Sequence, residues 1–72
     1  MSEKIILGID PGTTVMGFGI IKIERNQMYF IQMNELLLNK YDNHYIKLKI
    51  LFERTTDLID TFHPDEIAIE AP

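Results

Sequence analysis

The sequence contains no cysteine and no tryptophan, and only three prolines and four glycines among its 72 residues. The absence of cysteine excludes disulfide bonds and thiolate metal sites, although a core of this size is marginal without such support. No apolar run approaches the roughly 20 residues that span a bilayer, and Met1–Lys4 lacks the basic segment of a secretion signal. We therefore expect a cytoplasmic protein with no membrane partner.

Positive charge is also scarce. Seven Lys and Arg residues stand against eleven Asp and Glu residues, which gives a net charge of −4. This balance argues against nucleic acid as a partner, because neutralisation of phosphates drives most such binding. Divalent cations held by acidic side chains would offset that charge locally. The negative net charge therefore does not exclude a metal-dependent nuclease.

The chain is expected to form one domain, residues 1–72, organised around the apolar run Ile5–Ile9 that ends on Asp10. Such uniform apolarity is typical of a strand buried on both faces in the middle of a sheet. The next residues predict a turn, in which Pro11 sets φ at the second position and Gly12 accepts a positive φ at the third. An acid at the tip of a buried strand needs water, a hydrogen bond or a cation.

Four further elements follow the first strand, residues 4–10. We predict strands at Val15–Ile23, Met28–Leu38 and 65–70, and a helix from His44 to Phe62 with Asp42 or Asn43 as its N-cap. Glu24–Gln27 is expected to be a hairpin loop, and Asn34–Glu35 a β-bulge. One apolar stripe of the helix is expected to lie on the sheet: Leu48, Leu51, Thr55, Leu58 and Phe62, widened by Phe52 and Ile59.

The element order β-β-β-α-β predicts an α/β fold. Two hairpins make the first three strands an antiparallel meander, and the helix is a right-handed crossover to a fourth strand parallel to the first. The free edge of the first strand is the natural place for the fourth, so the mixed sheet has the order 3-2-1-4. Residues 65–70 then have an unpaired outer edge, through which we expect the chain to self-associate.

This strand order places two acids side by side, Asp10 on the first strand and Glu70 on the fourth. Each follows a small residue, Gly8 or Ala68, that lies two positions earlier on the same face. Carboxylates on parallel neighbours about 4.8 Å apart resist joint ionisation unless a cation such as Mg²⁺ or Mn²⁺ lies between them. Asp10 is equally explained as a turn residue that caps its own backbone, and Glu70 as a solvated strand end.

Three motifs together resemble the RuvC family, the bacterial Holliday junction resolvases with a ribonuclease H-like fold. They are Ile6–Thr13, Gly17–Gly19, and Phe62–Asp65 with Ala68–Glu70, in order and with fitting spacing. The resemblance covers essentially the whole chain. It implies a homodimeric bacterial endonuclease that cuts four-way junction DNA, with the branch-migration proteins RuvA and RuvB as further partners.

The resemblance also implies roles for the two acids. Asp10 and Glu70 match the first and second catalytic acids of the family, which hold Mg²⁺ or Mn²⁺, two ions in the complete enzyme. Such ions activate water for in-line attack on a phosphodiester. Asp10 is expected to bridge the ions, and Glu70 to hold one of them or to orient the water. The residues that bind DNA are not identified.

The family's remaining catalytic acids lie on a late helix that these 72 residues do not include. We therefore expect an N-terminal fragment of a single nuclease domain, inactive by itself. Two other classes stay open. Actin-like ATPases, including Hsp70 chaperones and sugar kinases, open with a similar strand, and there Gly12 and Thr13 would lie near a phosphate. A non-catalytic interaction module with the same fold is the other class.

Overall fold

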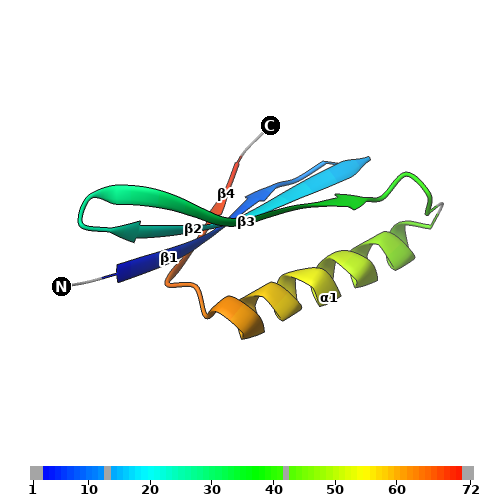
Figure 1. Cartoon of the computed structure of the whole chain (residues 1–72). Helices are drawn as coiled ribbons and strands as arrows, with labels where there is room; N and C mark the ends of the chain where they lie inside the picture. The colour runs from blue at the N-terminus through cyan, green and yellow to red at the C-terminus, as the bar shows by residue number, and fades with distance from the viewer. Residues whose placement is uncertain (1–2, 13, 42, 71–72) are drawn as a thin grey trace.

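The computed structural model describes residues 3–12, 14–41 and 43–70. Its elements form one mixed four-stranded sheet of order β3-β2-β1-β4, with α1 on one face (Figure 1). The α/β class, the strand order and the crossover helix are thus confirmed, and the predicted boundaries differ only at strand ends. The elements are β1 (Glu3–Asp10), β2 (Val15–Glu24), β3 (Gln27–Leu37), α1 (His44–Phe62) and β4 (Glu66–Ile69).

The core lies between α1 and the sheet face toward it, which we call the helix face. Alternation along β1 turns Leu7 and Ile9 to this face, and both are buried. Each apolar side chain of this size contributes about 1.5–3 kcal/mol when fully buried. The buried cluster consists of Leu7, Ile9, Met16, Phe18, Ile20, Leu36, Leu38 and Leu58.

Both ends of α1 have local signals that explain its length. At the start, the Asn43 side chain accepts a hydrogen bond from the backbone N–H of Tyr45 at 2.7 Å. At the end, His63 adopts the left-handed conformation with φ of 48°, and Pro64 follows. Asp42, the other expected cap, lies outside the described residues. Within the described ranges, no helix is long and apolar enough to cross a membrane.

The predicted apolar stripe of α1 is only partly right. Leu58 is buried and Leu51 and Phe62 are half-buried, as expected. Leu48, however, is 65% exposed and Phe52 is 72% exposed. With 3.6 residues per turn, these two lie about 80° and 120° around the helix from Leu58. The contact with the sheet is therefore narrower than predicted, because it follows the line of Leu51, Leu58 and Phe62.

The β2–β3 hairpin is closed by Arg25 and Asn26, whose φ values of 55° and 64° are typical of a type I′ turn. The expected bulge at Asn34–Glu35 is wrong. The pairing of β3 with β2 shifts between Ile20 and Ile21, where Ile31 is the extra residue. A bulge at this point reverses the alternation beyond it, which decides the face on which the later β3 side chains lie.

Candidate active site

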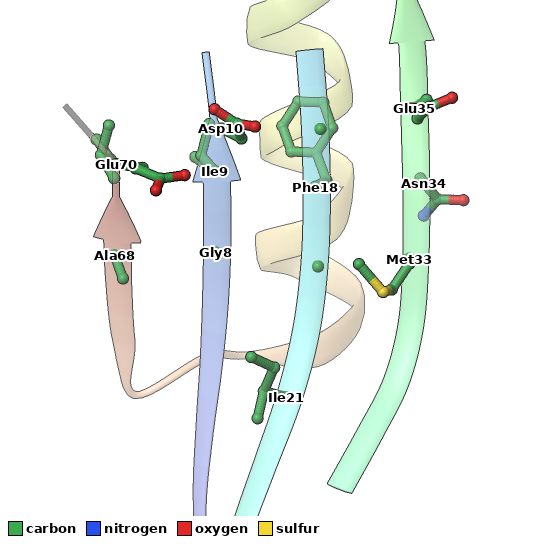
Figure 2. A pocket seen from close by; sticks show the side chains of 13 residues that line it. Gly8, Ile9, Asp10, Phe18, Ile21, Met33, Asn34, Glu35, Ala68 and Glu70 are labelled. Carbon is green, nitrogen blue, oxygen red and sulfur yellow. The ribbon is translucent and has the colours of Figure 1, made fainter. Parts of the chain in front are cut away.

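The sheet face away from α1, which we call the open face, bears the two predicted acids. Asp10 shares this face with Gly8, and the parallel register of Gly8 with Ala68 gives Glu70 the same face. Figure 2 shows Asp10 and Glu70 at the same end of neighbouring strands, with α1 behind the sheet. The structure thus brings the two predicted acids together.

Hydrogen bonds at both ends of β4 hold it against β1. At its start, the Ile5 N–H donates to Asp65 Oδ2 and the Asp65 N–H donates to the Ile5 carbonyl, both at 2.8 Å. Beyond its end, the Glu70 N–H donates to the Ile9 carbonyl at 3.0 Å. The backbone of Glu70 is therefore fixed beside the residue that precedes Asp10.

Two lysines carry charge pairs at the opposite end of the sheet from Asp10. Lys4 Nζ lies 2.9 Å from Glu66 Oε2, and this hydrogen bond, with the charge of Glu66, raises the pKa of Lys4. On the helix face, a hydrogen bond with Glu3 and the charges of Glu24 and Glu3 raise the pKa of Lys22. Exposed pairs of this kind add little stability, and the first pair joins the side chains of β1 and β4.

A hollow of about 800 Å³ lies over the open face beside the acids. Its floor is made of small residues, and none of the described glycines has a positive φ. A Cβ at Gly17 would lie 3.5 Å from Asp10 Cβ, an ordinary contact. The missing side chains therefore keep the face open rather than relieve backbone strain. The small residues of the hollow are Gly8, Gly17, Gly19 and Ala68.

A third carboxylate, that of Glu35, lines the same hollow. Glu35 pairs with Gly17, which pairs in turn with Asp10, so Asp10 and Glu35 lie in one row across the sheet. The sequence pattern did not indicate Glu35 as a site residue. Counting back from the hairpin turn without a bulge pairs Gly17 with Asn34, which sends Glu35 to the helix face. The signal needed was the position of the bulge at Ile31.

The donor set fits part of a metal site. Asp10 and Glu70 offer carboxylate oxygens, which Mg²⁺ and Mn²⁺ prefer. Among residues 3–12, 14–41 and 43–70, no three His, Cys, Asp or Glu side chains are grouped so that they could hold a metal ion. Glu35 lies two strands from Asp10, about 10 Å at the usual strand spacing. The described residues could therefore offer two ligands to a metal ion but do not form a complete site.

The turn after Asp10 depends on Gly12, but for a different reason from the expected one. The φ of Gly12 is not positive. A Cβ at this position would instead collide with the Val15 carbonyl oxygen. Glycine is required because the chain folds back tightly on itself here. Thr13, the other residue expected near a phosphate, lies outside the described residues.

Comparison with known proteins gives the family. The family model described as crossover junction endodeoxyribonuclease RuvC matches residues 6–71. The chain belongs to the RuvC family. It is 73% identical over 71 residues to crossover junction endodeoxyribonuclease RuvC of Christiangramia forsetii, and this match covers 99% of the chain and 37% of that protein. The chain is 53% identical over 70 residues to RuvC of Porphyromonas gingivalis, a match covering 97% of the chain and 37% of that protein.

The chain thus spans only 37% of the length of these two RuvC relatives. Among solved structures, it resembles the Aquifex aeolicus PPX-GPPA enzyme with a TM-score of 0.72. That match has 13% identity and covers 94% of this chain and 26% of the other, so it shows the fold alone. Membership of the RuvC family supports the nuclease interpretation, and the ATPase and interaction-module alternatives are not favoured.

Proposed function

We propose that the chain is the N-terminal part of a single ribonuclease H-like nuclease domain, residues 1–72, of a Holliday junction endonuclease. The reaction is metal-dependent hydrolysis of phosphodiester bonds in four-way junction DNA, in the bacterial cytoplasm. The observation that carries this proposal is the placement of Asp10 and Glu70 at the same end of paired strands in a RuvC-family chain. The hydrogen bond from the Glu70 N–H to the Ile9 carbonyl, 3.0 Å long, supports it.

In this proposal Asp10 and Glu70 are metal ligands and catalytic acids. Bound Mg²⁺ or Mn²⁺, two ions in the complete enzyme, would polarise the phosphate and activate water. Asp10 would ligate both ions, and Glu70 would hold one ion or orient the attacking water. The β1–β4 ladder contributes by fixing the backbone positions of both acids before substrate arrives, which limits reorganisation during the reaction. Gly12 is also proposed to lie near a phosphate.

The complete protein is proposed to act as a homodimer, with RuvA and RuvB as further partners. The 72-residue chain by itself is proposed to be inactive. This follows from the donor count, because two carboxylates cannot hold two metal ions in working geometry. Self-association through residues 65–70 is also proposed, because the outer edge of β4 pairs with no strand among the described residues.

A chimera tests the proposed activity. The 71 residues of this chain that match the C. forsetii relative, with 73% identity, would replace the corresponding segment of that protein. We expect the chimera to cut four-way junction DNA in Mg²⁺, whereas the 72-residue chain leaves it intact. Asp10→Asn and Glu70→Gln in the chimera should each lower the rate by at least about 100-fold, because metal ligation is worth several kcal/mol.

Asp60→Asn provides the matched control, since Asp60 is an exposed acid on α1. This variant should cut junctions at the rate of the unchanged chimera. Circular dichroism of each variant separates loss of fold from loss of metal. Full activity in the Asp10→Asn chimera, or cleavage by the 72-residue chain, would contradict the proposal.

A further inference from the structure

The strand β4 leads directly to Glu70, but its apolar residues do not define where it pairs along β1. Ile67 and Ile69, on the helix face, pair with two apolar residues of β1. A shift of β4 by two residues would place Ile69 beside Leu7, where Ile67 lies now. The apolar pattern of β4 therefore fits more than one register, and another contact must select the observed one.

Only the observed register brings Glu70 to Asp10. A shift of β4 by one residue would turn Glu70 to the helix face. The two-residue shift would keep Glu70 on the open face but place it beside Gly8, about 6.6 Å back along β1. Mg²⁺ holds its oxygen ligands about 2.1 Å away, so in neither case could the two acids share an ion.

Asp65, at the start of β4, makes the contact that can select the register. Its carboxylate accepts a hydrogen bond from the Ile5 N–H, and its own N–H donates to the Ile5 carbonyl, both at 2.8 Å. A hydrogen bond from a backbone N–H to a carboxylate is charge-assisted and stronger than one between neutral groups. One residue thus engages both backbone groups of Ile5, at a fixed point of β1.

The connection from α1 determines where Asp65 can lie. Only His63 and Pro64 separate it from Phe62, the last residue of α1, which packs against the core. The His63 N–H donates to the Ile59 carbonyl at 2.8 Å, and the ring of Pro64 restricts φ. The position of α1 on the sheet is therefore passed through a short, restricted connection to Asp65, and by Asp65 to β4.

We propose that Asp65 is a positioning residue for the acid pair, because its two hydrogen bonds with Ile5 set the register in which Glu70 lies beside Asp10. This inference rests on the proposed nuclease function, which needs both acids at one metal site. Asp65 precedes Glu70 by five residues, about 16 Å along a strand, so it acts through β4 and not as a metal ligand. Without it, β4 spends less time in the productive register, and the apparent metal affinity falls by that fraction.

The chimera with the C. forsetii relative tests this inference through two variants. Asp65→Ala removes the carboxylate, whereas Asp65→Asn keeps a side-chain oxygen that can accept from the Ile5 N–H. The first readout is hydrogen–deuterium exchange of residues 65–70 without metal or DNA, followed by mass spectrometry. Exchange should be about five- to tenfold faster in Asp65→Ala, and Asp65→Asn should restore most of the protection.

The metal dependence of cleavage gives the second readout. In the Asp65→Ala chimera, the Mn²⁺ concentration for half-maximal junction cleavage should rise about five- to tenfold. Saturating Mn²⁺ should restore the rate, because ions held by both acids favour the register that joins them. Glu70→Gln should stay slow at saturating Mn²⁺, because it lacks a ligand and not only its alignment.

Glu66→Gln is the matched control, because Glu66 also joins β4 to β1 at this end, through its 2.9 Å pair with Lys4. An exposed pair adds little, so exchange and Mn²⁺ dependence should stay unchanged. Circular dichroism confirms that each variant is folded. If Asp65→Ala does not fold, Asp65→Glu replaces it with the same expected results, since it keeps the charge but displaces the oxygen by one methylene.

The inference fails if the folded Asp65→Ala chimera exchanges as slowly as the unchanged one, or if Asp65→Asn is no better protected than Asp65→Ala. It also fails if Glu66→Gln has the larger effect, or if Asp65→Ala leaves the Mn²⁺ dependence of cleavage unchanged while the proposed function stands. An unchanged chimera that cuts no junctions would overturn the proposed function, and the exchange rates would still decide whether Asp65 sets the register.

Discussion

Gly12 is the residue at which a single added methyl group meets the backbone directly. A Cβ there would collide with the Val15 carbonyl oxygen, so the turn after Asp10 must open to accept it. We expect Gly12→Ala to cost about 1–3 kcal/mol of unfolding free energy, the range for strained or overpacked sites. Urea unfolding followed by circular dichroism measures this cost.

Gly8→Ala is the control for that experiment. A Cβ at Gly8 would lie 3.9 Å from its nearest neighbour, the Gly19 carbonyl oxygen. Alanine therefore fits at this position, and the unfolding free energy should change by less than about 1 kcal/mol. Equal stabilities of the two variants would show that the turn tolerates a side chain at Gly12.

Among single residues, the acid pair of Asp10 and Glu70 was predictable from the sequence, but the third acid, Glu35, was not. Asp10 and Glu70 each end an apolar strand, and their place needs only the strand order. The place of Glu35 needs the register of a long hairpin, which one extra residue, Ile31, reverses. A bulge leaves no dependable mark in the residue pattern, so Glu35 could not be assigned to the open face beforehand.

Among the elements, α1 makes the clearest contrast between buried and exposed leucines. Leu58 is 5% exposed and lies in the core, whereas Leu48 is 65% exposed on the flank. Leu58→Ala should therefore cost about 2–5 kcal/mol, through lost burial and a residual cavity. Leu48→Ala should cost less than about 1 kcal/mol, because its side chain is already largely hydrated.

The midpoints of urea unfolding measure the difference in stability between the two variants, which carry the same Leu→Ala change. Similar losses of stability for Leu48→Ala and Leu58→Ala would mean that the flank of α1 is covered in solution.

The helix period predicted both leucines on one stripe, because it gives the angle between residues and not the width of the surface beneath them. Strand order, helix ends and hairpins were predictable, since each has a local signal such as Asn43 or Pro64.

In the described part of the chain, the outer edge of β4 is unpaired, and this edge should make the chain associate into larger species. Pairing at the outer edge of residues 65–70 joins sheets side by side and does not have to close. We expect species larger than a dimer at high concentration, detectable by light scattering. Ile69→Lys should reduce them, because lysine on an edge strand opposes pairing.

Ile46→Lys on α1 serves as the comparison, since it adds the same charge at a side chain that is 45% exposed. It should leave the large species in place. Assembly that never exceeds a dimer, or equal effects of the two lysines, would count against pairing at β4.

The hydrogen bond between the Ile5 N–H and Asp65 Oδ2 joins residues 60 positions apart in the chain. Closing a loop of that length costs about 4 kcal/mol of chain entropy, whereas the meander of β1, β2 and β3 closes through short turns. We therefore expect the meander to form before β4 docks. On this order, the acid pair is the last part of this sheet to assemble, because Glu70 reaches Asp10 only when β4 pairs with β1.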